Sequence, residues 1–287
     1  MKIAVLSGKG GTGKTLVAVN LADVATNSVY TDCDVEEPNG HLFFKPTEIS
    51  YQPVSMSIPT IDNNLCSGCR ICVDFCRFNA LAFIAGKPVL FEDLCHSCGG
   101  CAMLCPKSAI TEKQNTIGKV MTGNSQNVTI ITGILNTGRA SGVPVIREVM
   151  RCLNNKTGLA VIDCPPGSAC VVMESIKDAD YCVLVAEPTI FGLHNLQMVT
   201  ELVQLFHKPF GVVLNKCTAE ANPSESYCKN KKLTILARIP FDKELGEISS
   251  NGEIAVRCKP AWHEFFLKLL DIIIKEAGYE ADTHNQR

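Results

Sequence analysis

The chain has 287 residues, of which 46% are hydrophobic, and its formal net charge is −2. This length suffices for one large α/β core and a small second module. The charge argues against a nucleic-acid-binding protein, which would carry a basic stripe or patch. No apolar run reaches the roughly 20 residues of a membrane-spanning helix. The apolar N-terminus runs straight into a glycine loop with no signal-peptide cleavage site, so we expect a cytoplasmic protein without stable membrane insertion.

Short apolar runs alternate with helical patterns along most of the chain. The runs that predict strands are residues 2–6, 30–34, 159–163, 181–186, 210–215 and 233–239, and the helical patterns are residues 14–25, 145–153, 168–179, 193–206 and 261–277. This alternation predicts an α/β fold with a mainly parallel sheet that is covered by helices on both faces.

The pattern breaks between about Ser57 and Gln114, in a cysteine-rich stretch without a long helix. The sheet needs strands from both sides of this stretch, so we predict an insertion rather than a terminal domain. The nucleotide-binding domain then comprises residues 1–56 and 115–287, and the insert comprises residues 57–114.

A glycine-rich loop follows the first predicted strand and opens the first predicted helix. Its residues Gly8-Lys9-Gly10-Gly11-Thr12-Gly13-Lys14-Thr15 fit the phosphate-binding pattern G-x-x-x-x-G-K-[ST] in the required context. The loop's backbone N–H groups and the helix N-terminus favour bound phosphates. Lys14 should contact the outer phosphates of ATP, and the Thr15 hydroxyl should bind Mg²⁺. The predicted nucleotide-binding residues of this loop are Gly8, Gly10, Gly11, Thr12, Gly13, Lys14 and Thr15.

The loop carries a second lysine, Lys9, in the pattern K-G-G-x-G-K-T. In this the chain resembles the deviant Walker A P-loop ATPases, the family of MinD, ParA, Mrp and the nitrogenase iron protein. The resemblance implies that Lys9 crosses a dimer interface to the phosphates of the partner subunit. The active form would then be an ATP-bound homodimer, and an ATPase that is slow without a partner protein.

Further motifs of this family follow predicted strands. Asp32-Cys33-Asp34 matches its D-x-D element, which implies that Asp34 activates the attacking water and that Asp32 supports the Mg²⁺ shell. Asp163, in Asp163-Cys164-Pro165-Pro166-Gly167, would hold Mg²⁺ through water. The resemblance also implies that Asn215, Pro240 and Asp242 lie in loops that recognise adenine.

Eight of the sixteen cysteines form two runs of equal spacing. Each cysteine of the run Cys66-x2-Cys69-x2-Cys72-x3-Cys76 recurs 29 residues later in Cys95-x2-Cys98-x2-Cys101-x3-Cys105. This is the pattern of a bacterial two-cluster ferredoxin, in which three thiolates of a run bind one [4Fe-4S] cluster and the fourth binds the other. Cluster one would have the ligands Cys66, Cys69, Cys72 and Cys105, and cluster two the ligands Cys95, Cys98, Cys101 and Cys76. Structural zinc and disulfides are the alternatives, but zinc usually takes separated C-x2-C pairs.

The whole arrangement resembles MinD-like P-loop ATPases that carry an inserted α+β ferredoxin-like domain. Our leading hypothesis is an ATPase that couples nucleotide binding to electron transfer through two [4Fe-4S] clusters to a redox partner protein. The second hypothesis is the assembly or insertion of an iron–sulfur or other metallocofactor into a client protein. The third is a positional organiser of the MinD or ParA type, which would need a membrane or DNA surface.

Overall fold

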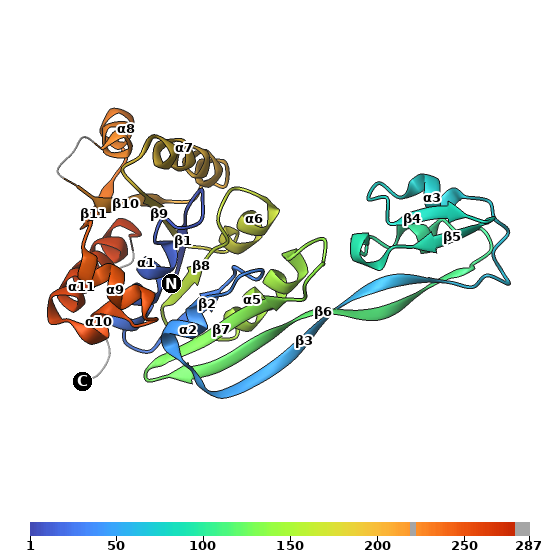
Figure 1. Cartoon of the computed structure of the whole chain (residues 1–287), viewed down its shortest axis with the longest axis horizontal. Helices are drawn as coiled ribbons and strands as arrows, with labels where there is room; N and C mark the ends of the chain where they lie inside the picture. The colour runs from blue at the N-terminus through green and yellow to red at the C-terminus, as the bar shows by residue number, and fades with distance from the viewer. Residues whose placement is uncertain (219–221, 279–287) are drawn as a thin grey trace.

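The computed structural model of the chain describes residues 1–218 and 222–278. Within these residues the core is a nine-stranded sheet with the strand order β11-β10-β9-β1-β8-β2-β7-β6-β3 (Figure 1). Seven neighbouring strands are parallel: β1 (Lys2–Leu6), β2 (Ser28–Asp32), β7 (Val128–Leu135), β8 (Ala160–Asp163), β9 (Tyr181–Ala186), β10 (Phe210–Cys217) and β11 (Ile235–Pro240). Parallel strands present their carboxyl ends at one edge of the sheet, and ligands of open α/β sheets bind at that edge.

Helices cover both faces of the sheet. One face packs against α5 (Val143–Asn154), α6 (Cys170–Ile176), α7 (Ile190–Leu205) and α8 (Pro223–Lys231). The other face packs against α1 (Lys14–Val24), α9 (Lys243–Ser250), α10 (Ala255–Cys258) and α11 (Pro260–Glu276), with the short α2 (Gly40–Phe44) beside them. The parallel strands are buried on both faces, which explains why they read as continuous apolar runs. None of the helices in the described ranges is long and apolar enough to cross a membrane.

A long antiparallel hairpin extends the sheet beyond β7. Its strands are β3 (Thr47–Ile61) and β6 (Ile110–Ser125), and β6 pairs with both β3 and β7. Figure 1 shows the hairpin leaving the core and carrying a small unit at its far end. That unit contains α3 (Ile71–Phe75), the two-stranded sheet of β4 (Leu81–Ile84) and β5 (Lys87–Leu90), the 3₁₀ helix η1 (Glu92–Leu94) and α4 (Gly100–Met103).

The six predicted strands and the five predicted helices form within a few residues of the expected bounds, whereas the parallel strand β7 was not predicted. The hairpin was not predicted, and the expected insert boundaries at residues 57 and 114 fall inside its two strands. Most residues of β3 are exposed, and the strand contains Pro53 and Pro59. Only Val54, Ile58 and Pro59 of β3 are buried, which is too few for an alternating apolar pattern, and prolines argue against a strand, so no sequence signal marked it. The end of the predicted segment 115–287 lies outside the described residues.

Candidate functional site

A groove of about 1260 Å³ lies at the carboxyl edge of the parallel strands. It brings together residues from four predicted motifs: Lys9, Gly10, Gly11, Gly13, Lys14, Thr15, Asp34, Asn215, Pro240 and Asp242 all line it. Gly8, Thr12, Asp32 and Asp163 do not line the groove, and the last three of them are buried. Phe241, between the predicted Pro240 and Asp242, also lines it, as do Leu245 and Ser249, which were not predicted.

The phosphate-binding loop is held in shape by its glycines and by the β10 end. Gly11 and Gly13 have φ values of 78° and 91°, in the left-handed region that favours glycine. A Cβ atom at Gly13 would lie 2.1 Å from Nδ2 of Asn215. The same Asn215 amide donates to the Thr12 carbonyl at 2.7 Å, and Nζ of Lys216 donates to the Gly11 carbonyl at 2.7 Å. In this structure the Asn215 amide group therefore supports the loop, and its contact with adenine stays a prediction.

Lys14 forms a buried ion pair with Asp163. Burial alone lowers the pKa of Lys14, but the charge of Asp163, helped by Asp32 and Asp34, raises it above its ordinary value. The other Asp163 oxygen accepts a hydrogen bond from the Tyr30 hydroxyl at 2.8 Å. Tyr30 was not predicted, and it fixes the carboxylate that faces the phosphate-binding lysine.

The two aspartates after β2 have different surroundings. Asp32 is fully buried, and its two oxygens accept hydrogen bonds from the backbone N–H groups of Asp34 (3.1 Å) and Gly40 (2.9 Å). Asp32 thereby holds the loop that presents Asp34 to the groove. Burial raises the pKa of Asp32 to about 7, with the nearby Asp163 adding to the shift, and burial raises the pKa of Asp34 to about 6. Their roles toward Mg²⁺ and water stay predictions.

The raised pKa of Asp32 predicts a pH-dependent stability of the protein without metal and nucleotide. Its pKa is about 7 when folded, against an ordinary value of 3.8, so the folded state binds the proton more tightly. We expect the free energy of unfolding to fall as pH rises from about 4 to about 7, by at most about 4 kcal/mol from this group. Urea unfolding at several pH values measures the slope. Asp32→Asn should make the unfolding free energy depend less on pH, whereas Asp178→Asn, at an exposed position, should leave the dependence unchanged. Equal pH dependence in Asp32→Asn and the native protein would contradict a raised pKa of Asp32.

Lys9 forms an ion pair with Glu187, at the end of β9. Glu187 is largely buried, accepts a hydrogen bond from the Thr189 hydroxyl at 3.2 Å and lies 3.6 Å from Nζ of Lys216. Burial favours the neutral acid, but Lys9 and Lys216 outweigh burial and lower the pKa of Glu187. Glu187 was not predicted as a site residue, although the phrase Glu187-Pro188 at a strand end was the sequence signal for it. This carboxylate holds the Lys9 side chain at the end of β9.

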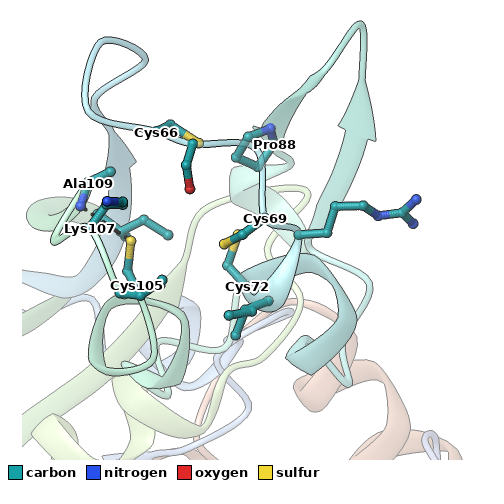
Figure 2. Close-up of a pocket in the computed structure, with 12 residues that line it drawn as sticks. Cys66, Cys69, Cys72, Pro88, Cys105, Lys107 and Ala109 are labelled. Carbon is teal, nitrogen blue, oxygen red and sulfur yellow. Dashed lines mark hydrogen bonds between the residues drawn. The ribbon is translucent and has the colours of Figure 1, made fainter.

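The eight cysteines of the insert line two separate cavities. Cys66, Cys69, Cys72 and Cys105 line a cavity of about 360 Å³ (Figure 2). Cys76, Cys95, Cys98 and Cys101 line the other, of about 380 Å³. The fourth cysteine of each run thus faces the first three of the other run. Figure 2 shows the four labelled cysteines of the first set around one space, with Lys107 beside them.

The backbone of the insert repeats at the same 29-residue spacing as the cysteines. Each run has three residues at equivalent positions in the left-handed region: Gly68, Arg70 and Asn79 in the first, and Ser97, Gly99 and Ser108 in the second. The equivalent backbone hydrogen bonds Cys76 N–H to Val73 and Cys105 N–H to Ala102 also recur. The internal repeat of the sequence is therefore a repeat of conformation, not of spacing alone.

All sixteen cysteines are free thiols. Across residues 1–218 and 222–278, no group of three or more His, Cys, Asp or Glu side chains is close enough to hold a single metal ion.

Comparisons with known proteins identify a nucleotide-binding domain. Residues 3–256 match the model of the CobQ/CobB/MinD/ParA nucleotide binding domain. Two uncharacterised proteins of Methanocaldococcus jannaschii, MJ0579 and MJ0578, are 28% and 29% identical, over 88% of this chain and 90% and 88% of their own lengths. An uncharacterised ATP-binding protein of that organism, MJ0547, is 22% identical over 76% of this chain and 65% of its own length.

Two solved structures show the same fold. The septum site-determining protein MinD of Pyrococcus horikoshii, complexed with Mg-ADP, aligns over 98% of both chains with 21% identity and a TM-score of 0.60. A single-substitution variant of Cyanothece McdA in complex with ATP aligns over 99% of this chain and 98% of its own, with 15% identity and a TM-score of 0.57. The chain belongs to the CobQ/CobB/MinD/ParA nucleotide-binding domain family, and its P-loop fold is close to that of MinD.

Proposed function

We propose that this protein is an ATPase that dimerises around its nucleotide and whose insert holds two [4Fe-4S] clusters for electron transfer to a partner protein. The observation that carries the proposal is the crossed pattern of the two cysteine sets, in which each set takes three cysteines from one run and the fourth from the other. Bound clusters supply one-electron transfer, which no side chain near the groove provides.

The residues of both sets fit such clusters. In a four-iron cluster each thiolate binds a different iron, so four sulfurs surround a wider space than one metal ion needs. Backbone N–H groups of Ser97 and Ala109 lie 3.5 Å and 3.3 Å from the sulfurs of Cys95 and Cys105. Donors of this kind stabilise thiolates and raise the reduction potential of a bound cluster.

The small core of the insert supports the same proposal. Its hydrophobic cluster has only three buried members, Cys72, Leu81 and Ile110. A unit of this size buries too little apolar surface to be stable alone and usually needs disulfides or a metal. Its thiols are free, so bound clusters would supply the missing stabilisation.

The chain's own residues account for nucleotide hydrolysis. Lys14 and the loop N–H groups bind the phosphates, Thr15 and Asp163 hold Mg²⁺, and Asp34 orients the attacking water. Lys14 exchanges its ion pair with Asp163 for the phosphates, which frees Asp163 for the Mg²⁺ shell. Lys9 leaves Glu187 and reaches the phosphates of the partner subunit.

Iron content tests the proposal directly. Protein purified without oxygen should be brown and contain about eight irons and eight acid-labile sulfides per chain. Cys69→Ser and Cys98→Ser should each lose about half of the iron, because each removes a ligand of one set. Cys170→Ser, at an exposed thiol of α6, is the matched control and should keep all of it. A colourless protein, or one that holds zinc instead, would contradict the proposal.

A positional ATPase is the second candidate function, and the comparisons favour it, because the similar structures are MinD and McdA proteins. Such a protein needs a surface on which to assemble. The apolar stripe of α11 is not available for this, since Phe266, Leu269, Leu270 and Ile273 are buried against the core. ATP-dependent sedimentation with lipid vesicles or DNA would support this candidate, and an ATP-dependent rate of cluster reduction would support electron transfer. Transfer of iron to an apo-acceptor protein would instead support cofactor assembly.

A further inference from the structure

The loop that joins β7 to α5, residues 136–142, is anchored on Val35 at both of its ends. The Leu135 N–H group donates to the Val35 carbonyl at 2.8 Å. The buried Val35 side chain packs against the backbone on both sides of the loop, since a Cβ atom at Gly133 or Gly142 would lie 2.5 or 2.6 Å from its methyl groups. Packing this close leaves no room for Val35 to move without moving the loop.

Val35 directly follows Asp34, the carboxylate that lines the nucleotide groove. Val35 also lines a second cavity, with Asp34, Glu37 and Pro166, next to the groove. Any shift of Asp34 toward bound nucleotide therefore displaces Val35, on which the loop of residues 136–142 is anchored.

The other side of the loop contacts the insert through Arg139. Its guanidinium pairs with Asp93 at 3.1 Å and lies 3.5 Å from Oδ1 of Asn115 and the carbonyl of Thr116, both on β6. Asp93 belongs to η1, which leads directly into Cys95. Arg139 and Cys95 line one cavity of about 300 Å³ between the loop, the hairpin and the insert.

We infer that Arg139 is a positioning residue that transmits the nucleotide state to the set Cys76, Cys95, Cys98 and Cys101. The inference rests on the proposed function, because that function makes this cysteine set the redox centre that a movement of η1 would affect. The Arg139–Asp93 pair is partly exposed, with 18% and 69% of the side chains accessible, and exposed ion pairs of this kind contribute little to stability. Its role is therefore to fix the geometry of η1 against the core, and not to hold the fold together.

The pair Lys113–Glu92 provides a matched control. Glu92 is the neighbour of Asp93 in η1, and its partner Lys113 lies 2.8 Å away on the hairpin itself. This pair fixes the same helix, and among the described residues no ion pair or hydrogen bond joins Lys113 to the loop of residues 136–142. Lys113→Ala removes one ion pair of η1, as Arg139→Ala does, and leaves the connection to Val35 in place.

Hydrogen–deuterium exchange of the full-length protein, with and without a non-hydrolysable ATP analogue, tests the inference. In the native protein and in Lys113→Ala, the analogue should change the exchange of residues 92–98. In Arg139→Ala that change should be lost, although the analogue still changes exchange at the phosphate-binding loop. The charge swap of Arg139→Asp with Asp93→Arg should restore it.

The inference would be overturned if the analogue still changed the exchange of residues 92–98 in Arg139→Ala. It would also be overturned if the analogue did not change that exchange in the native protein. The iron content of the same samples separates this result from the proposed function. Protein with full iron and an Arg139-independent response contradicts only the inference. Protein without iron contradicts the proposed function, whereas the exchange data still decide whether Arg139 connects the loop to η1.

Discussion

Replacement of Lys14 by Met should lower ATP hydrolysis by about 10²–10³-fold. The substitution removes a buried positive charge from the groove where the phosphates are expected, and an electrostatic contact of this kind is worth several kcal/mol in the transition state. Phosphate release under saturating ATP measures the rate, and binding of a fluorescent ATP analogue measures the loss of affinity. A variant with hydrolysis within about threefold of the native rate would exclude Lys14 from catalysis.

The same substitution should also destabilise the ligand-free protein. Removing one partner of a buried ion pair leaves the other charge uncompensated, which costs about 3–5 kcal/mol. Asp163 would be left with the Tyr30 hydroxyl and the nearby buried Asp32. The double variant Lys14→Met with Asp163→Asn should regain most of the stability but none of the hydrolysis. This double-mutant cycle separates a loss of fold from a loss of function.

The parallel part of the fold could be predicted from the sequence because its chemistry is local. Buried parallel strands must be apolar along their whole length, and the phosphate-binding loop needs glycines at positions such as Gly11 and Gly13. The carboxyl ends of such strands meet at one edge, so residues as distant as Lys14, Asp34 and Pro240 had to approach one another. The two cysteine sets follow the repeated spacing in the sequence, and their binding of clusters stays a prediction.

The contacts between motifs could not be predicted from the sequence. Glu187 and Tyr30 act on Lys9 and Asp163 across the sheet, and nothing in their local sequence says which charge they face. The strand β3 is largely exposed and β6 is buried only in part, without a regular apolar alternation in either, so the distance between insert and core could not be predicted. Arg139 has a role only because the hairpin brings η1 against the loop after β7.

Replacement of Lys9 by Ala should abolish ATP-dependent dimerisation and lower hydrolysis by about a hundredfold or more, while nucleotide binding by the monomer is retained. A cation supplied from another subunit stabilises the transition state without contributing to ground-state binding in its own subunit. Sedimentation velocity with a non-hydrolysable ATP analogue measures the dimer, and binding of the analogue to the monomer is the internal control. Dimerisation of Lys9→Ala at native concentrations would contradict the assignment.

Glu187→Gln should act in the opposite direction. Lys9 must leave Glu187 before it can reach the partner subunit, so the ion pair stabilises the monomer and opposes dimerisation. A partly exposed pair of this kind is worth up to about 1 kcal/mol, and each subunit of the dimer would release one, so removing both pairs should strengthen the dimer by up to about thirtyfold. Gln preserves the size of the side chain and its acceptor for the Thr189 hydroxyl. Weaker dimerisation in Glu187→Gln would show that Glu187 belongs to the dimer interface and does not restrain Lys9 in the monomer.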